Sequence, residues 1–461
     1  MNSSNHVAWR WYLSGDLKTE APLIIGSGKD DAADVQCIRD GDGRFFIPGT
    51  TIAGILRHLL SEKRAGDDIV SLAFGEAKDD GRQSLLLFHD APLSSKEQRF
   101  AVRDGVALDR TTKTAEDKRK FDYEVVERGQ TFSFRMEAVL RERDITEGKL
   151  NSMKELLQDI LRILTGGAMR IGAKRSRGFG KIVLENPRSA VFDFSEPSKR
   201  KEEGERWLDF KWSDEQLEPL DESSSETSSE HIVLHAEFVV PGAVFVRSYS
   251  VDPEAPDSVH FSSGGAPAIP GTSWAGVLRH ALSNLGRTMG VTHRMDTLTK
   301  SLFGEVREEK DGAFASNIIV DESVIKDARS LEYTRNKIDR FTGGVTPSAL
   351  FTEKPSFGGY VELSLLVRKE FFKKSPVSSG DVPSPEACVG ALLLALLDIG
   401  NGIQPVGGAA SVGRGMLSLR ALSLGEKNIL GGTGTGVCLD KGNAGTYLRA
   451  AGEYLGRKRL C

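Results

Sequence analysis

The chain has 461 residues, enough for two or three domains, and its formal net charge of −4 excludes a polyanion binder with a wholly basic surface. Its four cysteines (Cys37, Cys388, Cys438 and Cys461) include no CxxC pair, which excludes a disulfide framework and a zinc site and favours reduced thiols. The start of the chain does not resemble a signal peptide, and the longest apolar run, residues 389–398, is too short to span a bilayer. We therefore expect a soluble, cytoplasmic protein.

The first part of the chain predicts alternating strands and helices. Apolar spacing places strands at residues 7–17, 45–47, 131–140 and 181–185, and helices at residues 50–60 and 153–164. Thr50 or Thr51 suits the N-cap of the first helix. A Gly-, Ser- and Asp-rich loop is expected at residues 26–34, and the polar residues 101–128 should form an exposed excursion.

The second part follows the same plan. Strands are predicted at residues 231–240 and 360–367, helices at 272–285 and 387–397, an exposed excursion at 336–357, and a Gly-rich turn that leads into a strand at 409–419. Gly286 would end the first of these helices. The acidic, Ser-rich stretch before the second part should be a flexible linker, and the Gly-rich segment after residue 424 a tail.

Four short motifs occur twice, in the same order. Residues 47–58 and 269–280 share an Ile-Pro-Gly start and an Arg-His end. The other matched pairs are residues 74–76 with 303–305, 108–110 with 338–340, and 176–180 with 411–415. Because the offset in numbering grows only slowly from the first pair to the last, we infer one duplicated and fused domain. A period this long is not that of a solenoid, whose units run about 20–50 residues.

The strand–helix–strand–strand–helix–strand order of each copy is typical of an α+β fold of the ferredoxin or RNA-recognition type. We therefore predict two tandem domains of this class. Their predicted bounds are residues 1–194 for the first domain, 195–230 for the linker, 231–424 for the second domain and 425–461 for the C-terminal tail.

Three motifs follow one another in one domain: a glycine-bounded loop, an Ile-Pro-Gly-(Thr/Ser)-x-x-x-Gly-x-x-Arg helix start, and a Gly-x-x-x-Ser-Arg-Gly-Phe-Gly loop. Most of this pattern is repeated in the second copy. With them the chain resembles the RAMP superfamily, in particular the backbone subunits of type III CRISPR effector complexes. The resemblance covers residues 8–190 well and residues 232–424 moderately. A chain with two such domains resembles the fused backbone subunits of some subtypes.

The resemblance implies a function and partners. Such subunits stack along a CRISPR guide RNA, hold it against a complementary target RNA and assemble with other RAMP and type III effector subunits. A protruding thumb hairpin kinks the duplex, and some members cut the target RNA beside each kink with a loop aspartate and a divalent metal. We therefore expect an RNA-binding, metal-dependent endoribonuclease of antiviral defence that uses Mg²⁺ and has no membrane partner.

Basic and hydroxyl side chains predict the RNA contacts. Residues 170–181 combine five cations with three glycines, and both the forked donors of arginine and the exposed N–H groups of a Gly-rich loop suit phosphate oxygens. Hydroxyl side chains at a helix start predict a phosphate site, although ordinary helix capping would give the same pattern. Apolar residues at a polar hairpin tip predict a wedge between base steps, although anchoring of the loop to the core would give the same pattern. The expected contacts are Thr50, Thr51, Arg57, Asp109, Arg110, Arg170, Lys174, Arg175, Ser176, Arg177, Gly178, Gly180, Thr272, Ser273, Arg279, Lys337, Arg340, Ser411 and Arg414.

The catalytic residue implied by the resemblance is an aspartate about six residues before Asp40, which is Asp34, with Asp31 and Asp30 as rivals. A loop carboxylate can hold Mg²⁺ through water or orient the attacking 2′-hydroxyl of RNA, so Asp34 is also the expected metal contact. A solvated acidic loop is the alternative. In the second copy the same count reaches Pro256, so the pattern is broken there, and Asp257 is the choice if that copy cuts.

Two other functions stay open. The chain can be a non-catalytic scaffold of the same complex, or an endonuclease that processes the precursor of the guide RNA. The histidines form no metal-spaced cluster, and the sequence contains no Ser-His-Asp arrangement, P-loop or Rossmann fingerprint. Loss of cleavage with retained binding in Asp34→Ala would favour the nuclease over the scaffold.

Overall fold

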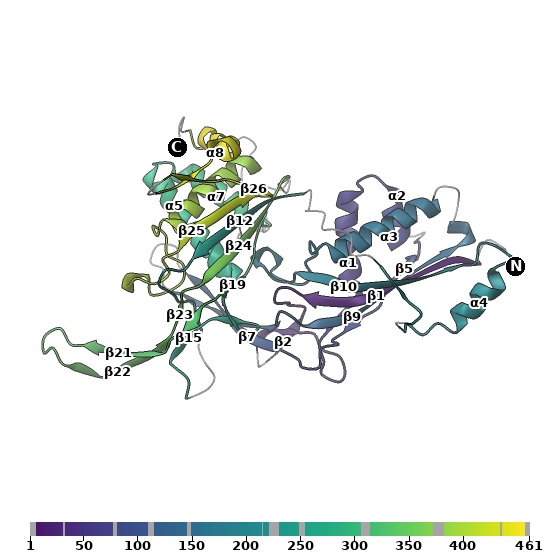
Figure 1. Cartoon of the computed structure of the whole chain (residues 1–461), viewed down its shortest axis with the longest axis horizontal. Helices are drawn as coiled ribbons and strands as arrows, with labels where there is room; N and C mark the ends of the chain where they lie inside the picture. Colours follow the sequence, from purple (N-terminus) through teal and green to yellow (C-terminus); the bar gives the residue numbers. More distant parts are fainter. Residues whose placement is uncertain are drawn as a thin grey trace. The chain divides into compact units, whose positions relative to one another are not determined.

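The chain forms two compact mixed α/β units, each with its own buried core (Figure 1). One unit is made mostly of residues before 229 and the other mostly of residues from 229 onward. None of the helices in the described residues is both long and apolar enough to cross a membrane. The computed structural model describes residues 6–30, 33–76, 81–108, 115–144, 149–213, 215–220, 230–248, 254–305, 314–371, 382–433 and 436–456.

The main sheet of the first unit is antiparallel, with the strand order β11-β10-β1-β9-β5. Buried side chains alternate along β9, and one face of the sheet joins the core formed with three helices. Leu13, for example, is fully buried opposite Met136. The elements are β1 (Val7–Thr19), β5 (Leu86–Phe88), β9 (Thr131–Arg141), β10 (Ile182–Asp193), β11 (Glu218–Pro219), α1 (Gly49–Lys63), α2 (Asp68–Phe74) and α3 (Lys149–Thr165).

A smaller sheet of the first unit has the order β2-β3-β8-β7. It includes a hairpin, β7–β8, in the predicted excursion, and β3 lies parallel to the second hairpin strand through the pair Val35 and Tyr123. The strands are β2 (Gly26–Asp30), β3 (Ala33–Cys37), β7 (Phe100–Leu108) and β8 (Ala115–Val126), with β4 (Phe46–Ile47) and β6 (Ala91–Pro92) pairing separately.

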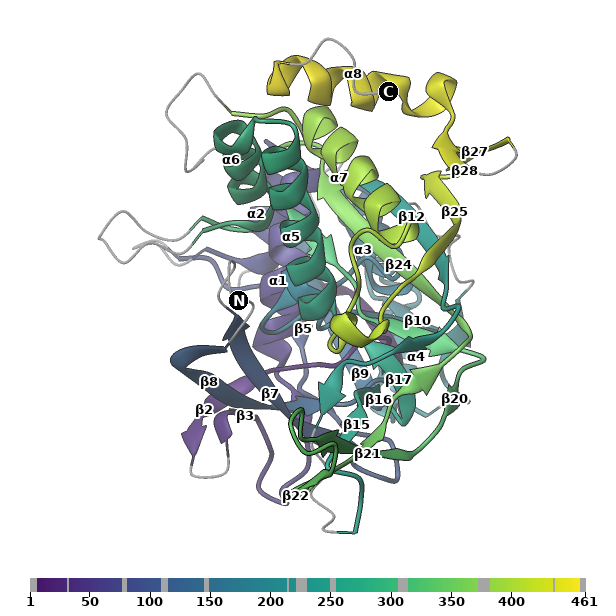
Figure 2. The same cartoon turned by 90° about the vertical axis from the view of Figure 1, so that its left-hand side faces the viewer.

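The second unit repeats this plan. Its sheet contains the order β25-β12-β24, with β18 pairing to β24, which matches β10-β1-β9-β5 strand for strand. The apolar helix α7 is buried along most of its length, and Figure 2 shows α8 lying across it. The main elements are β12 (His231–Val239), β18 (Ile318–Val320), β24 (Tyr360–Arg368), β25 (Ser418–Leu424), α5 (Gly271–Thr288), α6 (Thr292–Phe303), α7 (Pro385–Gly400) and α8 (Lys441–Leu455).

The excursion of the second unit is also a hairpin, formed by β21 (Tyr333–Ile338) and β22 (Val345–Lys354). Figure 1 shows it as a two-stranded ribbon that extends from the body of this unit. Its base pairs in parallel with β15 (Ser258–His260), as β8 does with β3. The remaining strands are β13 (Ala243–Val244), β14 (Arg247–Ser248), β16 (Ser262–Ser263), β17 (Ala266–Ile269), β19 (Ser323–Lys326), β20 (Arg329–Ser330), β23 (Ser356–Phe357), β26 (Lys427–Asn428), β27 (Leu430–Thr433) and β28 (Gly436–Leu439).

Two expected helix ends are wrong. Helix α1 begins at Gly49 with Pro48 as its N-cap residue and no side-chain cap, so neither Thr50 nor Thr51 caps it. Gly286 does not end α5 but lies buried inside it. A Cβ at this position would stand 2.7 Å from the Cβ of Met295 in α6. The glycine therefore permits close packing of the two helices rather than a turn.

The described part of the predicted linker forms regular structure. Residues 195–220 contain α4 (Arg200–Leu208) and β11, and their aromatic side chains cover the outer face of the main sheet. The indole N–H of Trp207 donates to the hydroxyl of Tyr12 at 2.8 Å. The charged composition had pointed to disorder, but these interspersed aromatics bury enough apolar area to fold. The predicted tail likewise contains β27, β28 and α8.

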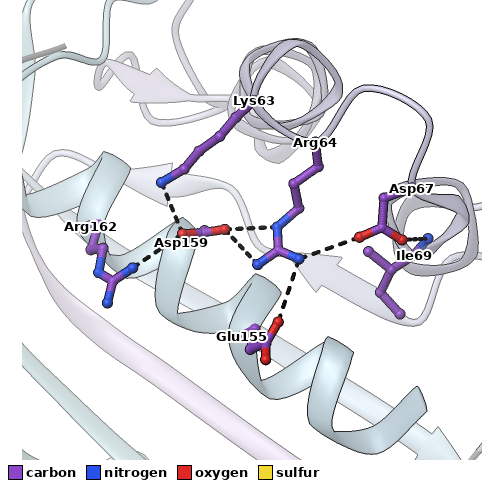
Figure 3. Close-up of polar contacts among 7 residues, drawn as sticks. All are labelled: Lys63, Arg64, Asp67, Ile69, Glu155, Asp159 and Arg162. Atoms are coloured by element: carbon purple, nitrogen blue, oxygen red, sulfur yellow. Dashed lines mark hydrogen bonds and ion pairs between the residues drawn. The ribbon is translucent and has the colours of Figure 1, made fainter. Parts of the chain in front are cut away.

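A buried carboxylate fastens α3 to the end of α1 in the first unit (Figure 3). Asp159 accepts hydrogen bonds from Lys63 at 2.9 Å and from Arg64 at 2.7 Å, and Arg162 lies 3.4 Å away. Burial alone would raise the pKa of Asp159, but the hydrogen bonds from Lys63 and Arg64 outweigh it and hold the pKa below its ordinary value. Leu394 of α7 stands at the matching position when the Gly-rich motifs of the two copies are aligned, so this fastening belongs to the first unit.

We predict that Asp159→Asn lowers the melting temperature of the first unit at pH 7, because three cations then face an uncharged amide. The free energy of unfolding should fall by about 3 kcal/mol. Since the folded pKa is depressed, the stabilisation is complete above the ordinary carboxyl pKa and is lost as the pH falls through the folded value. The melting difference between wild type and Asp159→Asn should therefore shrink below about pH 4. Calorimetry from pH 2.5 to 7 measures it.

Asp398 provides a control of opposite sign in the second unit. Burial raises the pKa of Asp398, so its charge opposes folding, and Asp398→Asn should leave the melting temperature at pH 7 unchanged or higher. A melting difference for Asp159→Asn that is the same at pH 3 and pH 7 would contradict the assigned role of the Asp159 charge.

Candidate functional site

A Gly-rich loop with the same backbone occurs in both units. Its left-handed positions are Gly172, Lys174, Gly178 and Gly180 in the first unit, and they recur in the second unit at Gly407, Ala409, Gly413 and Gly415. The same three backbone hydrogen bonds fasten each loop. In the first unit they are donated by Ile171 N–H to Gly180 O (2.9 Å), by Ala173 N–H to Ile24 O (2.9 Å) and by Gly180 N–H to Pro22 O (2.8 Å).

Glycine is required at the last left-handed position. A Cβ at Gly180 would lie 1.9 Å from the carbonyl oxygen of Ile171, and one at Gly415 would lie 2.2 Å from that of Val406. Both residues also have a positive φ, of 76° and 79°. No other residue type can bring the backbone this close, so the loop returns to the sheet at this point only through glycine.

The cations of the first loop differ in their surroundings. Arg175 is exposed, Arg170 is buried, and Ser176 and Arg177 are half-buried, with burial lowering the pKa of Arg177. Lys174 lies on aromatic rings of β8, with its Nζ 3.2 Å from the ring centre of Tyr123 and 4.5 Å from that of Phe121. Burial lowers the pKa of Lys174 to about 8.

The second loop has a different chemistry. Ser411 is exposed, but Arg414, expected to contact RNA, is buried. Its guanidinium lies 3.0 Å from the carboxylate of Glu353 in β22 and 5.1 Å from the ring centre of Tyr333. Glu353 is itself 5% exposed and also pairs with Arg247 and Arg335. Burial, and then repulsion from Arg247, lowers the pKa of Arg414. This cation is thus committed to its own unit.

The predicted aspartates of the two units occupy equivalent positions. Asp34 is exposed in β3, and its Oδ2 accepts a hydrogen bond from the Asp122 N–H of β8 at 3.2 Å. Asp257 is exposed just before β15, and its Oδ2 accepts from the Thr352 N–H of β22 at 2.8 Å. In both units the next residue begins the parallel pairing with the hairpin.

The count that reached Pro256 failed for a simple reason. The connection from the aspartate to the Ile-Pro-Gly motif is one position shorter in the second unit than in the first. Of the rival aspartates, Asp30 ends β2, and its side chain lies outside the described residues, as does all of Asp31. Asp109 and Arg110, at the tip of the first hairpin, also lie outside them.

Asp34 is the predicted metal contact of the first unit. Among the residues that the structure describes, no group of three or more His, Cys, Asp or Glu side chains is placed to hold a metal. Mg²⁺ commonly keeps several waters and binds one or two carboxylates together with substrate phosphates. The exposed Asp34 fits that mode and does not fit a closed, all-protein metal centre.

The helix starts offer less to phosphate than expected. Thr50 is exposed at the start of α1, but the first N–H of this helix, from Gly49, is already bound by the carboxylate of Asp90 at 2.8 Å. Arg57 is exposed further along α1. In the second unit Thr272 is exposed, whereas Ser273 and Arg279 are half-buried; Arg279 donates to the carbonyl of Phe303 at 3.1 Å.

The tip of the second hairpin is both basic and apolar. Lys337 and Arg340 are exposed, and Phe341 beside them is 98% exposed, with Ile338 at 60%. The backbone N–H groups of Thr342 and Phe341 bind the carboxylate of Asp339 and lower its pKa. An apolar wedge flanked by cations is the combination that suits insertion between nucleic-acid bases.

Sequence reasoning missed the residues that hold these groups in place, namely Asp122, Tyr123, Thr352 and Glu353. Asp122 and Thr352 are related by the same offset in numbering that relates the two hairpin tips. Extending that offset inward from the tips would have found them. The arginines around Glu353 left no such signal, because Arg247 and Arg414 come from distant segments.

We predict that Gly180→Ala destabilises the first unit by more than about 2 kcal/mol, because it combines a left-handed backbone with a collision against Ile171. Gly66→Ala is the matched control: φ is +88°, but nothing lies within 4 Å of the added carbon, so only about 1 kcal/mol should be lost. Calorimetric melting of both variants measures the difference. Equal losses would show that the close approach at Gly180 is not a constraint.

Comparison with known proteins agrees with this architecture. A family model, the RAMP superfamily, matches residues 16–183 and 238–417, about three quarters of the chain. The chain is also similar to the CRISPR system Cms endoribonuclease Csm3 of Methanocaldococcus jannaschii, with 26% identity over 205 residues that cover 38% of this chain and 78% of that protein. The resemblance inferred from the motifs is thus confirmed, and the chain belongs to the RAMP superfamily, with two RAMP regions in tandem.

Proposed function

We propose that this chain is a backbone subunit of a type III CRISPR effector complex that binds guide RNA and cleaves complementary target RNA. The similarity to an endoribonuclease of a CRISPR system supports this function. Guide RNA, target RNA and other subunits of such a complex would be its partners. Each unit would be ferredoxin-like, which the matching strand orders β10-β1-β9-β5 and β25-β12-β24-β18 support.

The observation that carries the nuclease proposal is the matched hydrogen bond of Asp34 and Asp257. Each aspartate is exposed, and each accepts the N–H of the hairpin strand beside it, at Asp122 or Thr352. A hairpin that displaces a base pair of the guide–target duplex would leave one nucleotide unstacked next to this carboxylate. Both units would therefore cut, at two positions separated by the spacing of the hairpins.

The reaction we propose is intramolecular transesterification of RNA. The 2′-oxygen attacks the adjacent phosphorus, the bond to the 5′-oxygen breaks, and the leaving 5′-oxygen takes a proton from water, so the products are a 2′,3′-cyclic phosphate and a 5′-hydroxyl. The fixed carboxylate of Asp34 would orient the 2′-hydroxyl and accept its proton. A bound Mg²⁺ would supply charge stabilisation at the phosphate, with Asp34 as its protein contact.

Binding of the RNA backbone would rest on the first Gly-rich loop. The exposed Arg175 and the adjacent Lys174 lie on this loop, and the forked donors of arginine suit phosphate oxygens. Contacts of this kind do not read sequence, so affinity should fall steeply with salt. The buried Arg414 makes the second loop a weaker contact.

We predict that Asp34→Asn abolishes one target cut and Asp257→Asn another, each by about 100-fold or more, while target binding stays intact. Asparagine keeps an oxygen for the N–H of Asp122 or Thr352, so the loop geometry is preserved and only the charge is lost. The measurement is cleavage of a labelled target RNA by the guide-loaded complex, with and without Mg²⁺.

Asp42→Asn, an exposed aspartate outside the site, should leave every cut in place. If Asp34→Asn also leaves every cut, Asp34 is not catalytic, and Asp30 and Asp31 become the residues to test. A wild-type complex that cuts nothing under any metal condition leaves the scaffold as the function. Cleavage of a precursor repeat by the isolated chain would instead identify a processing endonuclease.

We further propose that the β21–β22 hairpin is a thumb that inserts Phe341 into the guide–target duplex. Phe341→Ala should then reduce unstacking of the adjacent target base and slow the cut assigned to Asp257. A 2-aminopurine placed at that target position reports unstacking as a rise in fluorescence. Leu331→Ala, another exposed apolar side chain of this unit, should change neither signal. Unchanged fluorescence in Phe341→Ala would contradict the insertion.

A further inference from the structure

The ammonium of Lys174 lies on a site formed by Phe121 and Tyr123 of β8 and supported by Gly105 of β7, and this site is called the seat of Lys174. Phe121 projects from β8, 40% exposed, and covers Gly105 of β7, where a Cβ would collide with the ring at 2.4 Å. Tyr123, two positions further along β8, is buried. The ammonium of Lys174 lies against both rings, so a cation of the Gly-rich loop fastens the base of the hairpin.

The seat lies next to the group that holds the proposed catalytic carboxylate. Phe121 and Tyr123 flank Asp122, whose N–H binds Asp34. Any displacement of this part of β8 therefore moves the donor that orients Asp34. The backbone does not need lysine here, since Ala409 adopts the same left-handed conformation in the second unit, with φ of 59° against 55°. The lysine side chain must serve another purpose.

The second unit makes the same fastening with other groups. Glu353 follows Thr352, the residue whose N–H binds Asp257, and matches Tyr123 in the parallel pairing. Arg414 of the second Gly-rich loop pairs with Glu353. In both units, a cation of the Gly-rich loop thus holds the residue after the aspartate-binding amide, although the cation comes from different loop positions.

We propose that Lys174 is a positioning residue for Asp34, and that Arg414 has the same role for Asp257 through Glu353. This inference rests on the proposed function, because it takes Asp34 and Asp257 as the cutting residues. It assigns the Gly-rich loop a second task besides binding RNA. The first unit would depend on a contact with neutral rings, and the second on a buried ion pair.

The test compares three variants in the guide-loaded complex. Lys174→Gln should slow the Asp34-dependent cut at saturating target by about tenfold or more, since small misplacements of reacting groups cost this much. The Asp257-dependent cut in the same RNA is the internal reference and should not change. Lys174→Arg keeps a cation on the rings and should restore most of the rate. Arg175→Gln removes a charge from the same loop without touching β8 and should weaken RNA binding instead.

Gly105→Ala is the second route to the same outcome. It should push Phe121 aside and unseat the cation while leaving every charge in place, so it should slow the same cut. Hydrogen exchange of residues 121–124 gives a readout that needs no cleavage, and exchange should be faster in Lys174→Gln and Gly105→Ala than in wild type.

The outcomes separate the two proposals. If Lys174→Gln slows both cuts alike, or acts only by weakening target binding as Arg175→Gln does, Lys174 is an RNA contact and the positioning role is overturned. Unchanged hydrogen exchange would overturn it as well. If the wild-type complex cuts nothing but exchange rises, the fastening of β8 stands and the proposed nuclease function fails alone.

Discussion

The close approach of backbone to backbone at Gly180 and Gly415 is the constraint on which both units depend. Only glycine permits it, and it returns the chain from the loop to the last strand of the main sheet. It also fixes the direction in which the rest of the loop faces. The side chains at positions 174 and 414 reach the hairpin because this backbone turn has one geometry.

The two Gly-rich loops thus have the same backbone conformation but different side-chain chemistry. The first loop presents the exposed Arg175 and holds Lys174 on aromatic rings, whereas the second uses its arginine internally, against a buried carboxylate. Buried ion pairs of this kind seldom add net stability, because desolvation offsets their attraction, but they tolerate the loss of neither partner. The arginine of the second loop is therefore held by a contact inside its own unit, whereas Arg175 of the first loop is exposed.

Much of the fold was predictable because it rests on short-range patterns. Apolar alternation placed β9 and β24, helical spacing placed α3 and α7, and the repeated motifs revealed the duplication. The misses have physical causes. Gly286 serves helix packing, which composition alone does not distinguish from a stop. The aromatic cover around Trp207 lies among charges that suggested a linker. Arg414 was expected to contact RNA. Its burial was missed because it depends on Glu353, which is distant in the sequence and leaves no pattern near residue 414.

The difference between the Lys174 and Arg414 contacts limits which segments can be swapped between the two units. A chimera that moves the first loop into the second unit would place phenylalanine, the residue at position 179, where Arg414 meets Glu353. Glu353 would keep Arg247 and Arg335 but lose its buried partner, and no ring would stand at position 353 to accept a lysine at 409. The Gly-rich loop and the base of the hairpin therefore have to be moved together, because each keeps its contacts only with its own partner.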